Sequence, residues 1–201
     1  DIVPMVGENR VLAHLGLQCI NRAQRPGISA LIELSGRQFP LSTSDVVFGL
    51  APLINAAGRL ADADQAVKLL ASTDKTEAAD IAQVLLRRNQ LRKEHDQQIQ
   101  DEAIRCFEAT PGWEALRSLV LYQPAWHKGV IGIAAARMVE RFHRPAILLT
   151  ESNGMAVGSA RTVPGFNVYQ AIKSCGDLLT TFGGHAHAAG LPLPLDAVPE
   201  I

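Results

Sequence analysis

The sequence predicts an α/β fold in which a helical first part precedes a domain built on a mixed β-sheet. Residues 75–109 contain neither Pro nor Gly and carry apolar side chains on roughly one stripe, which is typical of a single long helix. Beyond Pro111-Gly112, short apolar runs alternate with helical patterns, and Ser152-Asn153-Gly154 predicts the turn of a hairpin.

Apolar residues at helical spacing predict shorter helices at three places before the long one. They are expected over residues 8–24, 28–34 and 62–72. Ser44-Asp45 is a candidate N-cap for the segment that follows it. Because residues 48–59 contain Gly and Pro, we expect them to form a loop with short helical pieces.

The long helix would reach about 50 Å at 1.5 Å per residue, which is more than one compact domain of this size needs. We therefore expect it to bridge two domains. After it, the pattern of apolar runs predicts alternating strands and helices. Strands are expected over 118–122, 146–150 and 155–159, and helices over 130–142 and 167–175.

The charge balance is close to neutral, with 19 Lys and Arg against 20 Asp and Glu. Binding to nucleic acid would therefore use local basic clusters rather than bulk charge. Cys19, Cys106 and Cys175 are odd in number and form no C-x-x-C pair, which argues against a disulfide framework and favours a cytoplasmic setting. No apolar run approaches the roughly 20 residues that span a bilayer, so we expect no membrane partner.

Both ends of the sequence have the character of cut boundaries. The chain opens on Asp1 followed by an apolar pair, which is typical of the last residues of a strand, and it stops at Pro199-Glu200-Ile201. We therefore expect the sequence to be a piece of a longer protein.

Two glycines and a histidine occur together in Gly183-Gly184-His185. Glycines let a backbone approach a ligand closely, and the small residues that follow suit a tight turn into a short helix whose N-terminus favours an anion. The residues alone leave two interpretations open, which are a phosphate-binding loop and a glycine turn made for packing.

Two further segments offer groups that can bind phosphate. His127 and Lys128 lie between an expected strand and an expected helix, at the sheet edge where ligands of such folds bind, although a lone His is more often structural. Ser159 and Arg161 are separated by one residue near the end of an expected strand, so their side chains share one face. Arg is well suited to bidentate recognition of phosphate.

Taken in order, these motifs resemble a known family. Residues 118–195 resemble the DHH-associated domain of the DHH phosphoesterase superfamily, whose signature is a glycine-glycine-histidine loop. A narrower resemblance, to the RecJ family, rests on four segments in the same order. They are Asn55-Ala56-Ala57-Gly58-Arg59-Leu60, Trp126-His127-Lys128-Gly129-Val130-Ile131-Gly132-Ile133, Gly158-Ser159-Ala160-Arg161 and Phe182-Gly183-Gly184-His185.

The resemblance implies a cleft between a DHH domain that holds two divalent metal ions and a DHH-associated domain that closes over single-stranded DNA. The implied activity is 5′ to 3′ exonuclease cleavage in DNA repair and recombination. It would use Mn²⁺ or Mg²⁺, since two metals can activate water and stabilise the leaving oxygen. Among the metal ligands only Asp1 has a counterpart here, so we expect this piece to bind no metal and to be inactive alone.

The matching motifs also imply a role for single residues. His185 is expected at the scissile phosphate, as the catalytic residue. The residues expected to bind substrate are Asn55, Arg59, His127, Lys128, Ser159, Arg161, Gly183 and Gly184. The implied parts are the end of the DHH domain with its linking helices (1–60), the long connecting helix region (61–110) and the DHH-associated, substrate-binding domain (111–201).

One position departs from the family pattern, because RecJ proteins usually have Arg where this chain has Leu53, so one expected cation is missing. Aromatic platforms for stacked bases are sparse, and we expect the nearby candidates to be core residues. They are Tyr122, Trp126, Phe166, Tyr169 and Phe182. Two other functions stay open, which are a short-oligonucleotide or phosphoadenosine phosphatase of the same superfamily and a noncatalytic nucleic-acid-binding module. The motifs imply no particular protein partner.

Overall fold

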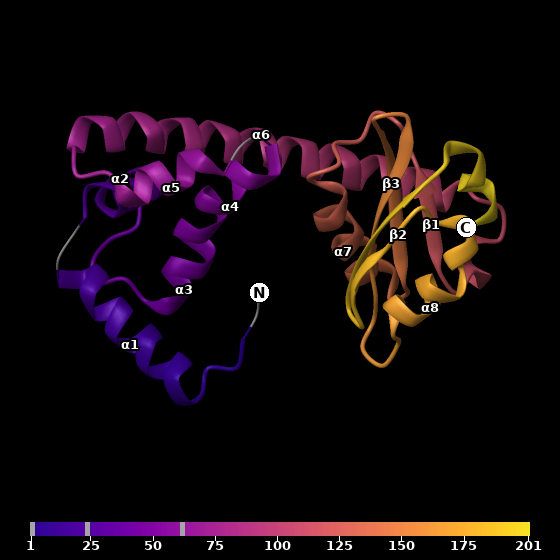
Figure 1. The fold of residues 1–201 in the computed structure, drawn as a ribbon, viewed down its shortest axis with the longest axis horizontal. Coiled ribbons are helices and arrows are strands. Elements are labelled where there is room, and N and C mark those ends of the chain that lie inside the picture. The colour runs from indigo at the N-terminus through magenta and orange to yellow at the C-terminus, as the bar shows by residue number, and fades with distance from the viewer. Residues whose placement is uncertain (1–2, 23–24, 61–62) are drawn as a thin grey trace. The chain divides into compact units, whose positions relative to one another are not determined.

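The computed structural model describes residues 3–22, 25–60 and 63–201, and the chain divides into two compact units (Figure 1). Unit 1 comprises Asp1–Arg92 and unit 2 comprises Lys93–Ile201. The boundary falls inside one continuous helix, α6 (Lys75–Glu108), which therefore contributes residues to both units. None of the helices within the described ranges is long and apolar enough to cross a bilayer.

Unit 1 is helical. Leu31, Leu53 and Leu69 come from three different helices and are almost fully buried in one apolar core. Gly27 permits a close approach between two of these helices, because a Cβ there would lie 1.9 Å from the Leu69 carbonyl oxygen. The elements before α6 are α1 (Gly7–Arg22), α2 (Pro26–Ser35), α3 (Thr43–Asp45), the π-helical turn η1 (Val46–Leu50), α4 (Ala51–Leu60) and α5 (Asp64–Ala71).

The segment around α3 and α4 corrects two expectations. Ser42, rather than Ser44 or Asp45, caps the helix: its hydroxyl accepts from the Asp45 N–H, and the Asp45 carboxylate accepts from the Ser42 N–H at 2.9 Å. The residues expected to form a loop are helical, as η1 and then α4. Pro52 is compatible with this course because it follows a π turn, where the regular hydrogen-bond ladder is already interrupted.

The single long helix expected from the sequence is confirmed as α6. Asp74 caps its N-terminus, since the Asp74 Oδ1 atom accepts a hydrogen bond from the Glu77 N–H at 2.8 Å. In the second half of α6, the buried Phe107 ring packs edge-on against Trp113. The helix thus takes part in the apolar core of unit 2.

Unit 2, all of which is described, is built on a five-stranded mixed sheet in the order β1-β2-β3-β5-β4. β1 and β2 are parallel, and the remaining neighbours are antiparallel, which confirms the expected mixed sheet. Asn153 and Gly154 join β2 to β3 with positive φ angles, as the hairpin turn requires. The elements after α6 are η2 (Trp113–Ala115), β1 (Leu119–Tyr122), α7 (Ile131–Phe142), β2 (Ala146–Ser152), β3 (Met155–Arg161), α8 (Val168–Ser174), η3 (Gly176–Leu178), β4 (Gly183–His185), β5 (Ala188–Leu193) and η4 (Leu195–Glu200).

The two faces of this sheet carry different helices (Figure 1). Ala160 of β3 belongs to one apolar cluster with Ile172 of α8. The neighbouring Ser159 lies against α7, where a Cβ on Gly132 would be 2.8 Å from its Oγ. Because successive side chains of a strand point to opposite faces, α7 and α8 cover opposite faces of the sheet.

The glycine-histidine segment is a β-hairpin of β4 and β5, and the short helix expected after it is not formed. Gly183 pairs with Gly190 across the hairpin. The physical reason lies in β5, where Ala189, Leu191 and Leu193 alternate with more exposed residues and are buried. A strand paired with β3 buries these side chains together, which a helix at this place would not do.

Candidate phosphate-binding site

Ser159 and Arg161 share the face of β3 that is turned toward α7. The Arg161 Nη1 atom donates to the Ser159 Oγ at 2.9 Å and to the Ala160 carbonyl oxygen at 2.7 Å. These bonds hold the half-buried guanidinium in a defined orientation. A positively charged planar group held in this way is preorganised to bind an anion.

Gly183, Gly184 and His185 form the edge strand β4 and are exposed. Gly184 has a φ of 146°, and a Cβ there would lie 2.3 Å from the Ala188 carbonyl oxygen, so the hairpin requires glycine at this position. With two glycines side by side, no side chain covers this stretch of backbone. It is open to a ligand.

An open cavity of about 260 Å³ brings two of the sequence-predicted segments together. Its lining consists of Ser159, Arg161, Gly183, Gly184, His185, Ala188, Ala189 and Gly190. The lining includes a guanidinium, a hydroxyl, an imidazole and bare glycine backbone, and it contains no carboxylate. This set of groups is suited to the oxygens of a phosphodiester.

His185 has one ring nitrogen fixed by the backbone. Its Nδ1 atom accepts a hydrogen bond from the His187 N–H at 3.2 Å. In the neutral imidazole the ring proton is therefore on Nε2, which becomes a donor. Such a donor at the cavity wall can bind a phosphate oxygen.

His127 lies in the loop between β1 and α7 and has the same arrangement. Its Nδ1 atom accepts from the Gly129 N–H at 3.1 Å, and its ring stacks on His95 of α6 with centroids 5.5 Å apart. Desolvation lowers the pKa of His127, and the charges of His95 and Lys128 lower it further. His127 therefore favours the neutral form, in which Nε2 carries the proton.

The first turn of α7 connects His127 with the cavity. The His127 carbonyl oxygen accepts from the N–H groups of Val130 and Ile131, and the next residue, Gly132, lies against Ser159 and Arg161. Lys128 is exposed and its Nζ atom donates to the Ser152 Oγ at 3.2 Å. His127 and Lys128 thus flank the cavity rather than line it.

His95 lies in the middle of the long helix, and nothing in the local sequence marks it as a functional residue. It contacts His127 through the fold, across 32 positions of sequence, and no local pattern marks such a pair. Trp126 is buried as expected, and its Nε1 atom donates to the Glu102 carboxylate at 2.7 Å, which lowers the pKa of Glu102.

The remaining predicted residues belong to unit 1 or lie outside the description. Asn55 and Arg59 are exposed one turn apart on α4, so they share a face of that helix. Leu53 stands where the family pattern has an arginine. Its side chain is buried in the helical core, so it packs against other apolar residues. Asp1 lies outside the described residues. Across 3–22, 25–60 and 63–201, no group of three or more His, Cys, Asp or Glu side chains fits a metal ion.

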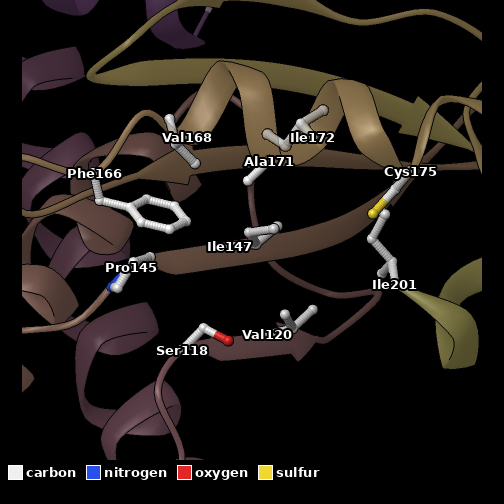
Figure 2. A pocket seen from close by; sticks show the side chains of 10 residues that line it. All are labelled: Ser118, Val120, Pro145, Ile147, Phe166, Val168, Ala171, Ile172, Cys175 and Ile201. Atoms are coloured by element: carbon white, nitrogen blue, oxygen red, sulfur yellow. The ribbon is translucent and has the colours of Figure 1, made fainter.

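A second cavity, of about 170 Å³, lies on the opposite face of the sheet, beside α8 (Figure 2). Val120 and Ile147 form its floor, and Phe166 stands at one end while Cys175 and Ile201 stand at the other. Phe166 is 45% exposed and Tyr122, on β1, is 37% exposed, so the expectation that these two are core residues was wrong. The lining is mainly apolar and holds no charged side chain, so this cavity is unsuited to a phosphate backbone.

Comparison with known proteins agrees with the motifs. Residues 116–201 match the DHHA1 domain family. The chain is 41% identical to the single-stranded-DNA-specific exonuclease RecJ of Bacillus subtilis, over 100% of this chain and 26% of that protein. It is 40% identical to the protein of the same name from Escherichia coli, over 98% of this chain and 36% of that protein. The chain thus spans about a quarter to a third of the length of these curated relatives.

Solved structures show the same fold. The crystal structure of RecJ from Thermus thermophilus in complex with Mg²⁺ is similar over 100% of this chain and 31% of that chain, with 34% identity and a TM-score of 0.88. A structure of exonuclease RecJ bound to manganese is similar over 100% of this chain and 49% of that chain, with 31% identity and a TM-score of 0.83. Residues 116–201 are therefore similar to the DHHA1 domain family, and the whole length of the chain is similar to part of the RecJ proteins.

Proposed function

We propose that this chain is the substrate-binding part of a 5′ to 3′ single-stranded-DNA exonuclease that acts in DNA repair and recombination. The observation that carries the proposal is the cavity in which the Ser159–Arg161 pair meets Gly183, Gly184 and His185. Its groups suit a phosphate, and the similar curated proteins are named single-stranded-DNA-specific exonucleases.

Each residue has a distinct task in this proposal. Arg161 binds a backbone phosphate, and Ser159 holds the guanidinium in place. The uncovered backbone at Gly183 and Gly184 lets the sugar-phosphate chain approach closely. His185 donates from Nε2 to an oxygen of the scissile phosphate, which makes it the catalytic residue of this unit.

The other predicted residues extend the interface. His127 and Lys128 bind a phosphate next to the cavity, while Asn55 and Arg59 bind a separate stretch of the strand from unit 1. Within this scheme, residues 111–201 are the DNA-binding domain, 61–110 the connecting helix region and 1–60 the end of the preceding domain. Single-stranded DNA in the cytoplasm is the partner.

Two divalent ions, Mn²⁺ or Mg²⁺, would serve the whole protein. Solved relatives with this fold carry one or the other metal by their titles. The described residues of this chain do not fit such a site, because they include no suitable cluster of ligands. We therefore expect the chain alone to bind single-stranded DNA and not to cleave it.

Binding to labelled oligothymidylate by the wild-type chain and by Arg161→Ala and His185→Ala tests the proposal. Loss of affinity in both variants supports it, and unchanged affinity in both contradicts the assignment. Dinucleotides serve as competitors. If a dinucleotide displaced the long strand at equal concentration, the phosphatase alternative would replace the exonuclease. Degradation of the strand by the chain with Mn²⁺ would contradict the expected inactivity.

A further inference from the structure

Gly132 is the second residue of α7 and lies against the two polar side chains of β3. A Cβ at this position would be 2.8 Å from the Arg161 Nη2 atom and 2.8 Å from the Ser159 Oγ atom. Both distances are too short for a real contact, so any side chain at position 132 would displace both groups. The absence of a side chain therefore creates the space in which the Ser159–Arg161 pair sits.

We propose that Gly132 is a positioning residue for the DNA phosphate site and acts through Arg161. This inference rests on the proposed function, because it takes Arg161 as a phosphate contact. The Arg161 guanidinium donates at 2.9 Å to Ser159 and at 2.7 Å to the Ala160 carbonyl, and these bonds define where the guanidinium points. A methyl group at position 132 shifts the guanidinium away from that direction.

The location of the pair at the start of α7 gives it a second property. A helix N-terminus carries about half a positive charge, and Arg161 places a full positive charge beside it. The two positive groups repel each other when no anion is bound, and an anion that contacts both relieves this repulsion. Gly132 permits this proximity, since a larger residue would separate the guanidinium from the first turn of the helix.

Alanine at position 132 should leave the fold intact. The atoms that a Cβ would meet are the ends of two side chains, which can rotate away, whereas at Gly184 the nearest atoms belong to the backbone. Gly132 is not among the glycines with positive φ, and alanine is a better helix former than glycine. The substitution therefore changes the direction of Arg161 without removing its charge.

The test is a double-mutant cycle in the 201-residue chain. It compares Gly132→Ala, Arg161→Ala and the double variant, with Gly176→Ala as the control, since a Cβ on Gly176 meets nothing within 4 Å. Three quantities are measured: the affinity for fluorescein-labelled oligothymidylate, the thermal unfolding midpoint, and the NMR resonance of the Arg161 Nε–H group without DNA.

We expect Gly132→Ala to shift the Arg161 resonance, to keep the unfolding midpoint of the wild type, and to weaken DNA binding roughly tenfold. In the Arg161→Ala background the same change should have no further effect, because the group it acts through is absent. Gly176→Ala should behave as the wild type in all three measurements.

Two results would overturn the inference alone. One is an unshifted Arg161 resonance with unchanged affinity in Gly132→Ala, and the other is an equal loss of affinity with and without Arg161. A shifted resonance combined with normal DNA binding by both single variants would instead overturn the proposed function, and the DNA-positioning role with it. Collapse of the fold in Gly132→Ala would show that the two side chains cannot give way, which also contradicts the inference.

Discussion

Arg161→Lys separates the charge of this side chain from the geometry of its guanidinium. The Arg161 Nη1 atom donates to the Ser159 Oγ at 2.9 Å and to the Ala160 carbonyl at 2.7 Å, while Nη2 lies at the first turn of α7. A lysine ammonium carries its three donors on one atom, so it cannot reproduce the planar fork in which one nitrogen binds Ser159 and another faces a phosphate.

The expected loss can be worked from these contacts. A hydrogen bond to a charged group contributes about 1.5–3 kcal/mol, so losing the forked contact should weaken DNA binding roughly ten- to hundredfold. Because lysine keeps the positive charge, the dependence of affinity on salt should stay as in the wild type. Arg161→Ala should weaken binding further and lower the slope of log affinity against log salt by about 0.7.

Fluorescence anisotropy with labelled oligothymidylate, at several salt concentrations, measures both quantities. Arg117→Lys and Arg117→Ala are matched controls, because Arg117 is exposed in the same unit and lies outside the cavity lining. Wild-type affinity in Arg161→Lys would refute the reasoning, since it would mean that only the charge at this position matters.

The remaining predictions concern stability and metal dependence. Gly184→Ala should lower the free energy of unfolding, measured in urea, by about 2 kcal/mol or more, because a Cβ at this position meets backbone atoms. Gly183→Ala should lower it little, because a Cβ there has no atom within 4 Å. The pKa of His127 lies below its ordinary value of 6.5, so the unfolded chain takes up the proton first and stability should fall as the pH drops below 6.5. His127→Gln should flatten that part of the profile, and an unchanged profile would contradict the assignment. Trp126→Phe removes the 2.7 Å bond to Glu102 and should cost about 1.5–3 kcal/mol, more than Glu102→Gln, which keeps an acceptor. Chelation with EDTA should leave the affinity of this chain for single-stranded DNA unchanged, and a marked loss would reveal a metal in the interface.

The sequence predicted the regular elements well wherever a periodic pattern ran for a whole element. The long helix from Lys75 lacks any Gly or Pro. The turn between the two strands is predicted by Asn153-Gly154, a residue pair that favours tight hairpin turns. Residues 48–59 were misjudged because their Gly and Pro suggested a loop. The burial of Leu50 and Leu53 in the helical core, together with the cap at Ser42, outweighs those local preferences.

The candidate site shows a similar division. Ser159 and Arg161 could be placed on one face from their spacing, and the structure brings them together with Gly183, Gly184 and His185 in one cavity. The hairpin form of that glycine segment was not foreseen, because it depends on pairing of β5 with β3. The contacts of Gly132 with Arg161 and of His95 with His127 arise only from packing between distant segments.

NMR mapping of oligothymidylate on the chain, labelled at backbone amides and arginine side chains, tests the central claim most directly. Our account predicts that the largest changes fall on Arg161, on Gly183 to His185 and on the first turn of α7, and that Arg161→Ala removes them. Changes confined to the opposite face of the sheet, around Val120, Ile147 and Phe166, would contradict it.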